Sequence, residues 1–141
     1  MFTDQTGKLP HASSWGNNHQ MVVHEIDKES TLVNPMKNWA EGKTILVQRQ
    51  ALNQMQLQGI VPKHQVLENK ISTAYKAEIL SADTTYQLVP PDDHRRNISE
   101  KDIQAWKDHF VCVLSGKAAA FTMHLWFQAI PQDKQQVLLL R

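Results

Sequence analysis

The sequence predicts a mixed α/β domain in which helices pack against a single sheet. Short strand-like segments separated by polar turns come first, and strands then alternate with helices, which is the order typical of such sheets. With 141 residues, the chain is long enough for one domain that buries about two-thirds of its unfolded surface. We find no repeat, low-complexity tract or linker that would divide it, and expect residues 1–141 to form one domain.

The first part of the chain predicts three strands. Met1–Asp4 is strand-like, and a loop rich in Ser, Gly and Asn separates it from the apolar run Gln20–Ile26. A polar turn leads into Thr31–Val33, where Pro35 either ends the third strand or marks it as an edge strand. These segments predict a hairpin.

The middle of the chain predicts two strand-and-helix pairs. Apolar residues at mostly helical intervals indicate a helix over about Thr44–Gln58, and Gly59 suits its C-terminal cap. Ile60–Leu67 then reads as a strand, Ser72–Leu80 as a helix and Thr85–Val89 as a strand.

A long amphipathic helix is predicted to open near Glu100. Its apolar residues recur on one helical face: Ile103, Trp106, Phe110, Val113 and Leu114. At about 100° per residue, Lys107 lies nearly above Glu100, at the boundary between core and solvent. Two further helical segments are expected over about Met123–Ala129 and Gln132–Leu140.

Composition excludes several classes of protein. A formal net charge of +1 and a pI near 7.9 exclude a globally basic protein, so nucleic-acid contacts would depend on a local cluster. The single cysteine, Cys112, excludes an internal disulfide framework and a zinc site of the usual spacing, and we interpret it as a packing residue. Without a membrane-length apolar run or a signal-peptide pattern, we expect a soluble, intracellular protein.

Three carboxylates fall where the chain leaves a strand or enters the helix after one: Asp4, Glu68 and Glu100. In open α/β sheets, ligands gather at the carboxyl ends of strands. Carboxylates from separate strands can hold two divalent ions about 4 Å apart and promote phosphodiester chemistry. Two alternatives stay open. Glu100 also completes a capping box with Asn97, and Asp27, in a hairpin turn, is a competing candidate for the first acid.

Several segments carry a resemblance that spans nearly the whole chain. They are Thr3–Gly7, Leu32–Asn38, Pro62–Asn69, Gln87–Pro91 and His94–Asn97 leading to Glu100. Together they resemble the catalytic core of retrotransposon and retroviral-type integrases. The resemblance implies a ribonuclease H-like five-stranded mixed sheet flanked by helices, with strands 1–3 antiparallel and strands 4 and 5 parallel. It also implies an Asp, Asp, Glu triad with Mg²⁺ (or Mn²⁺) in a two-metal site, action on DNA ends and target DNA, a homo-oligomer, and a nuclear location if the protein is functional.

Carried over by position, the resemblance makes Asp4, Glu68 and Glu100 the catalytic and metal-binding residues. The loop before the third acid corresponds to Pro90–Asn97. Nucleic-acid binding falls on five residues around this loop and the following helix: Arg95, Arg96, Asn97, Lys101 and Lys107.

The chain departs from the family pattern in two respects. Related elements carry Leu-Asp-Asn-Glu where this chain has Leu67–Lys70, so the second acid is longer by one methylene and a neighbouring acid is replaced by Lys70. Magnesium demands near-ideal geometry, so we expect catalysis to be impaired. Because only three residues precede Asp4, we also expect a truncated chain, from a decayed element or a longer polyprotein. The rival hypothesis is a non-catalytic remnant that binds nucleic acid or an integrase partner.

Overall fold

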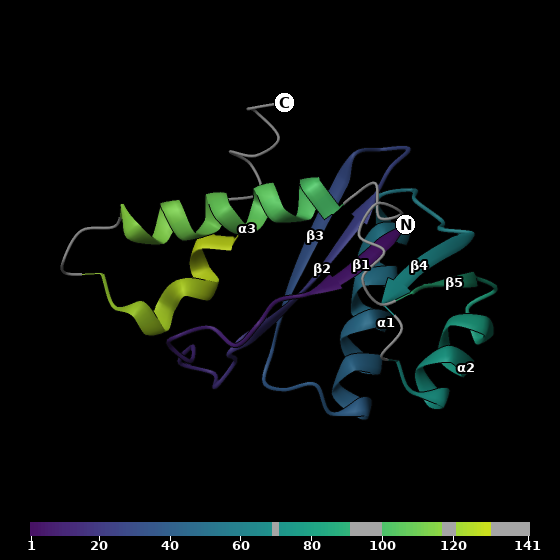
Figure 1. The fold of residues 1–141 in the computed structure, drawn as a ribbon, viewed down its shortest axis with the longest axis horizontal. Helices are drawn as coiled ribbons and strands as arrows, with labels where there is room; N and C mark the ends of the chain where they lie inside the picture. The colour runs from purple at the N-terminus through teal and green to yellow at the C-terminus, as the bar shows by residue number, and fades with distance from the viewer. Residues whose placement is uncertain (69–70, 91–99, 117–120, 131–141) are drawn as a thin grey trace.

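The sheet has five strands, and helices lie on both of its faces (Figure 1). The computed structural model describes residues 1–68, 71–90, 100–116 and 121–130, and within them not the side chains at positions 68, 100, 102 and 103. The strands are β1 (Phe2–Gln5), β2 (His19–Glu25), β3 (Ser30–Met36), β4 (His64–Glu68) and β5 (Thr85–Val89). The helices are α1 (Glu41–Leu57), α2 (Thr73–Ser81), α3 (Glu100–Ser115) and the 3₁₀ helix η2 (Met123–Ala129).

The strand order is β3-β2-β1-β4-β5. β1, β2 and β3 pair antiparallel, whereas β4 is parallel to both β1 and β5. This confirms the predicted mixed sheet, in which the first strand is central and the hairpin lies at one edge. β1 is the shortest strand, with four residues against seven in β2, and the backbone N–H of Val66 on β4 donates to the carbonyl oxygen of Met1 at 2.9 Å.

Proline affects two strands. Pro35 marks β3 as an edge strand, which was one of the two predicted alternatives, and the strand continues to Met36 because one side of its backbone needs no ladder partner. β4 begins at His64 rather than near Ile60, because Pro62 has no N–H to give to a ladder. The strand also includes Glu68, which we had expected just beyond its end.

The helix boundaries follow local chemistry. Gly59 adopts a left-handed φ of 72° after α1, as expected for a helix C-terminus. Ser72 is the N-cap of α2, and its Oγ accepts a hydrogen bond from the backbone N–H of Tyr75 at 3.1 Å. The segment predicted over Met123–Ala129 is a 3₁₀ helix, and the one predicted over Gln132–Leu140 lies outside the described residues.

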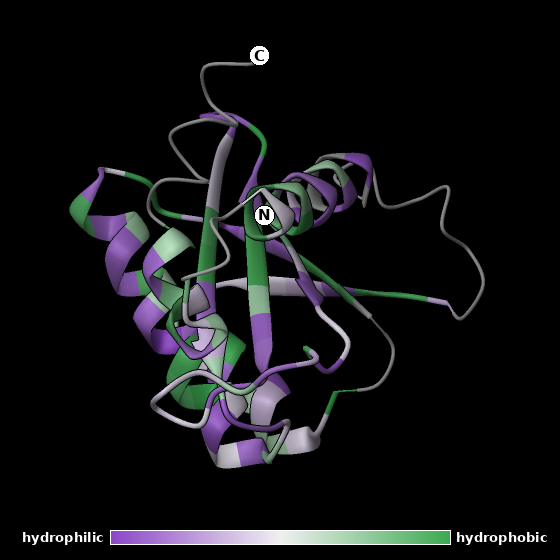
Figure 2. Cartoon of the chain, turned by 90° about the vertical axis from the view of Figure 1, so that its left-hand side faces the viewer, coloured by the Kyte–Doolittle hydropathy of each residue, from purple (hydrophilic) through white to green (hydrophobic). Residues whose placement is uncertain are grey.

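The core has a layer on each face of the sheet (Figure 2). On one face, α1 packs on a cluster that includes Met21, Val23 and Met55. On the other face, α3 and η2 pack on Val22 with Val33. Residues 21–23 are all completely buried, since side chains of a central strand alternate between two covered faces.

Two expectations about single residues need comment. Cys112 is exposed, so its interpretation as a packing residue was wrong: it lies on α3 away from the face that carries Trp106 and Phe110. Trp15, for which the sequence offers no role, stacks on Phe127 at a centroid separation of 4.6 Å while remaining 66% exposed.

None of the helices in the described parts of the chain has the length and apolarity needed to cross a membrane.

Candidate active site and nucleic-acid face

Helix α3 is fixed on the sheet by aromatic residues. Trp106 and Phe110 are almost completely buried and stack at 5.1 Å between ring centroids, and Trp126 of η2 meets Phe110 edge-on at 6.1 Å. The indole N–H of Trp126 donates to the carbonyl oxygen of His11 at 2.9 Å, which also ties η2 to the loop after β1. α3 is therefore a rigid support for the side chains that it directs towards β1.

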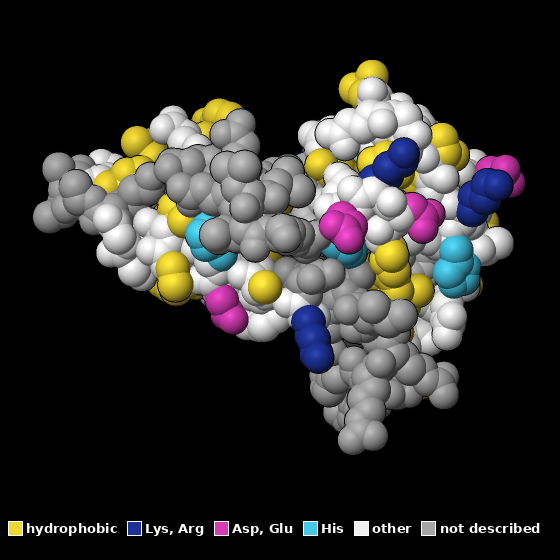
Figure 3. Space-filling view, turned by 90° about the horizontal axis from the view of Figure 1, so that it is seen from above, with side chains coloured by type: hydrophobic (Ala, Val, Ile, Leu, Met, Phe, Trp, Pro, Cys, Tyr) yellow, Lys and Arg dark blue, Asp and Glu magenta, His cyan; other side chains and the backbone are white. Residues whose placement is uncertain are grey.

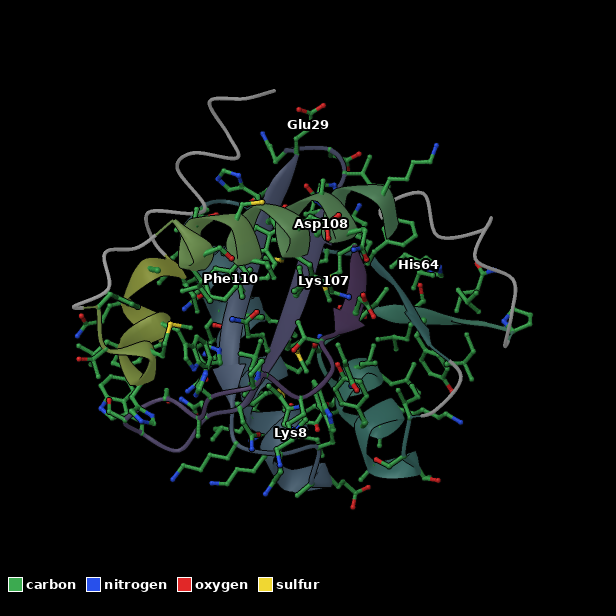
Figure 4. The ribbon with its side chains drawn as sticks, turned by 60° about the vertical axis from the view of Figure 1, so that its left-hand side comes forward. Lys8, Glu29, His64, Lys107, Asp108 and Phe110 are labelled. Atoms are coloured by element: carbon green, nitrogen blue, oxygen red, sulfur yellow. The ribbon has the colours of Figure 1, made fainter. Side chains whose placement is uncertain are left out.

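Lys107 of α3 forms an ion pair with Asp4 of β1. Its ammonium contacts Oδ2 of the Asp4 carboxylate, across a sequence separation of 103 residues. The other oxygen, Oδ1, accepts a hydrogen bond from the backbone N–H of Gln5 at 2.7 Å. Both side chains are largely enclosed, with 16% of Asp4 and 25% of Lys107 exposed. Figure 4 shows Lys107 extending from α3 towards β1.

Asp4 and Glu68 lie on neighbouring parallel strands. Phe2 of β1 pairs with Val66 of β4, and Asp4 and Glu68 each follow two residues later along their strands. Glu100 opens α3, two helical turns or about 10 Å before Lys107. Figures 1 and 4 both show this first turn of α3 on the side of β4. The three predicted acids thus come from β1, from the last residue of β4 and from the first residue of α3.

A buried polar network on the opposite face of the sheet fixes β1 against β4. Gln65 donates to Thr3 Oγ1 at 2.8 Å, and Gln48 of α1 donates to Gln65 Oε1 at 2.9 Å. The Tyr75 hydroxyl donates to Gln48 Oε1 at 2.8 Å, and burial raises the pKa of this phenol well above its usual range. Because Thr3 directly precedes Asp4, the network holds the register on which the position of Asp4 depends.

The sequence predicted a divalent-metal site, and the described side chains permit one test of it. Among the described side chains, which do not include those of Glu68 and Glu100, no three His, Cys, Asp or Glu gather as a metal site. In this structure the cation beside the Asp4 carboxylate is the Lys107 ammonium. Carboxylate oxygens are the ligands that Mg²⁺ prefers, so the chemistry of Asp4 fits a divalent ion, which would meet an oxygen that already pairs with Lys107.

The predicted nucleic-acid residues divide into two groups. Lys101 is exposed in the first turn of α3, and Lys107 lies partly buried against Asp4. Arg95, Arg96 and Asn97 lie outside the described residues. Seen from above in Figure 3, acidic and basic side chains are scattered over the surface, with no broad region of one sign among the described residues.

The competing candidate for the first acid occupies a hairpin turn. The backbone N–H of Asp27 donates to Glu25 Oε1 at 3.2 Å, in the turn between β2 and β3 where Glu29 adopts a left-handed φ of 48°. Asp27 therefore lies at the end of the hairpin, whereas Asp4 lies on the central strand beneath α3.

Many solved structures have a similar fold, and two of them match almost the whole chain. One is a chain of the simian T-cell lymphotropic virus intasome in complex with the PP2A regulatory subunit B56 gamma, with a TM-score of 0.69 and 14% sequence identity over 97% of this chain. The other is the catalytic core domain of BIV integrase, with a TM-score of 0.63 and 10% identity over 98% of this chain. The fold is that of a retroviral integrase catalytic core.

This integrase-core fold is ribonuclease H-like, as predicted. The chain spans 45% of the matched intasome chain and 79% of the BIV core domain chain. No sequence-family model matches the chain, and neither does any curated protein. At such low identity the likeness shows the fold alone.

Sequence reasoning missed two features of the integrase-core fold. It assigned Lys107 to DNA and did not pair it with Asp4, and it gave no role to Gln48 or Gln65. Asp4 and Lys107 are 103 positions apart, and Thr3 and Gln65 are 62 positions apart. Pairs so distant leave no local pattern in a single sequence. The one available signal was that Gln48 and Gln65 are polar residues within otherwise apolar segments, since buried polar groups are normally hydrogen-bonded.

Proposed function

We propose that the chain is the catalytic core of a retrotransposon integrase-type polynucleotidyl transferase, which processes DNA ends and joins them to target DNA. The observation that supports this proposal is the integrase-core fold itself, in which Asp4 lies on the central strand, Glu68 ends the neighbouring parallel strand and Glu100 opens α3. Divalent ions such as Mg²⁺ or Mn²⁺, held by Asp4, Glu68 and Glu100, would activate the attacking oxygen and stabilise the leaving oxygen of a phosphodiester.

The side chains of this chain would bind and orient the DNA backbone. Exposed Lys101 places a positive charge in the first turn of α3, and Lys107 offers an ammonium two turns further along the helix. Arg95, Arg96 and Asn97 precede the helix and would add phosphate contacts. Integrase cores act on DNA within cell nuclei as multimers, so we propose a homo-oligomer that acts on nuclear DNA.

Glu68 is expected to weaken this activity. A glutamate moves the carboxylate about 1.5 Å further from the backbone than the aspartate of related elements. A misplacement of about 1 Å in a catalytic group can reduce the rate about 100-fold. The Glu68→Asp variant should therefore nick supercoiled plasmid in Mg²⁺ or Mn²⁺ about 100-fold faster than the wild type, an assay that requires no knowledge of the DNA ends.

The matched control is Glu68→Asp combined with Glu100→Gln, which keeps the shortened second acid and removes the third carboxylate. We expect it to be inactive. If Glu68→Asp does not nick faster than the wild type, the assignment of Glu68 to the metal site is wrong.

A second candidate function is a non-catalytic remnant that binds nucleic acid or another integrase subunit through the same face. It is favoured by one observation: both oxygens of the Asp4 carboxylate already have partners within the chain. Such a remnant would bind DNA in a salt-dependent manner with no response to Mg²⁺. A millimolar Mg²⁺ titration monitored by thermal unfolding separates the two, because a cation that binds only the folded state raises the melting temperature.

A further inference from the structure

The environment of Asp4 leaves little room for a second cation while Lys107 is in place. Oδ2 contacts the Lys107 ammonium, and Oδ1 accepts the Gln5 N–H at 2.7 Å. With 16% of Asp4 exposed, water screens charges here poorly. An ammonium and a divalent cation on one carboxylate would lie within a few ångströms and repel each other strongly.

Lys107 is able to leave Asp4 without moving the helix. Trp106 and Phe110, on either side of it in sequence, hold α3 on the sheet with 1% and 2% of their surface exposed. The lysine stem has four carbons and rotates freely, and 25% of this side chain already reaches solvent. The nearest acidic residue on the helix, Asp108, accepts a hydrogen bond from Gln104 at 2.8 Å instead (Figure 4). An ammonium released from Asp4 therefore has solvent within reach.

We propose that Lys107 and a divalent cation are alternative partners of Asp4, so that cation binding releases Lys107 to bind a phosphate of the nucleic acid. The inference rests on the proposed function, because it takes Asp4 as a metal ligand and DNA as the polyanion. Lys107 holds Asp4 in its charged form and in position while the cation is absent, and it becomes a phosphate ligand once the cation arrives. Cation and DNA binding are then positively coupled, and the coupling is the same in both directions.

The first test measures cation affinity without DNA or catalysis. Isothermal titration calorimetry with Ca²⁺ compares the wild type with Lys107→Gln, which removes the competing ammonium. We expect Lys107→Gln to bind Ca²⁺ at least about fivefold more tightly, the lower end of typical coupling factors. Lys101→Gln is the matched control, because it removes a positive charge from the same helix without touching Asp4. Its Ca²⁺ affinity should change by less than about twofold, since an exposed charge is well screened.

The second test measures DNA affinity by fluorescence anisotropy with a short labelled duplex, with and without Ca²⁺. Wild-type affinity should rise at least about fivefold with Ca²⁺, and Lys107→Gln should lose this gain. Asp4→Asn, in which Lys107 has no carboxylate to pair with, should bind the duplex without Ca²⁺ about as tightly as the wild type does with it.

Two results would overturn the proposal while leaving the metal site intact. In the first, the wild type binds Ca²⁺ as tightly as Lys107→Gln does. In the second, Lys101→Gln gains as much Ca²⁺ affinity over the wild type as Lys107→Gln does. If no protein in the series binds Ca²⁺, the proposed metal-dependent function fails as well. Should Lys107→Gln fail to fold, as judged by circular dichroism, Lys107→Met takes its place because it keeps the apolar stem.

Discussion

Gln65 of β4 donates a hydrogen bond to Thr3 Oγ1 of β1 at 2.8 Å, and this contact joins two neighbouring parallel strands behind the candidate active site. Gln65 is completely buried, and 5% of Thr3 is exposed. Since a register shift of one residue would turn Asp4 to the opposite face of the sheet, the contact helps to determine which face carries the carboxylate.

We expect Gln65→Ala to lower the free energy of unfolding by about 2–4 kcal/mol, because in a buried environment it removes the donor to Thr3 Oγ1 and the acceptor of the Gln48 side-chain N–H. Urea unfolding followed by circular dichroism measures the change. Gln87→Ala, at an exposed position of β5, is the control and should have an effect within about 0.5 kcal/mol. Equal stability of the two variants would show that the network contributes nothing.

Trp106 should be the main anchor of α3. Trp106→Ala removes a side chain with 1% exposure that stacks on Phe110, and it should cost about 3–5 kcal/mol of stability. Val111→Ala, on the same helix with 57% exposure, is the matched control and should change stability by less than about 0.5 kcal/mol. Thermal unfolding of both variants is the measurement, and a small effect of Trp106→Ala would contradict the packing described for α3.

The ion pair between Arg49 of α1 and Glu78 of α2 predicts a pH dependence. Arg49 Nη2 donates a hydrogen bond to Glu78 Oε2 at 2.7 Å. This hydrogen bonding lowers the pKa of the Glu78 carboxyl below its ordinary value of 4.5. A carboxylate whose pKa is lower in the folded state stabilises the fold above the pKa of the unfolded state, and this contribution is lost as the pH falls through the folded-state pKa. Arg49→Gln should therefore be less stable than the wild type at neutral pH.

The difference between Arg49→Gln and the wild type should shrink as the pH falls below 4.5 and disappear once Glu78 is protonated. Urea unfolding at a series of pH values measures it, and a concentration of salt that screens exposed charges should also reduce it. A difference that is the same at every pH would mean that Arg49 acts through packing and not through its charge.

DNA binding should depend on Lys101 through its charge alone. Lys101→Gln removes one phosphate contact from the exposed first turn of α3, so the slope of log affinity against log salt concentration should fall by about 0.9. Lys43→Gln, at an exposed position of α1 on the other face of the sheet, should leave the slope unchanged. If both variants lower the slope equally, the DNA does not lie along α3.

The sequence by itself determined the order and type of the main elements. The spacing of Trp106 and Phe110 predicted the buried face of α3, and the apolar run Gln20–Ile26 predicted the strand β2. Such signals survive in a single sequence because periodicity reflects which side of one element faces the core. The sequence also predicted Asp4 at the end of the first strand and Glu100 at the start of a helix, where β1 and α3 have them, and it put Glu68 one residue too late, beyond the strand that it ends.

Only the tertiary structure decided which polar groups meet. The contacts Lys107–Asp4 and Gln65–Thr3 join residues 103 and 62 positions apart, and no local pattern relates them. They form because the crossover from β1 to β4 and the packing of α3, which bury the apolar faces, bring these side chains together. Hydrophobic periodicity is a property of each segment, whereas the pairing of charges is a property of the assembled sheet, and the candidate site depends on the second.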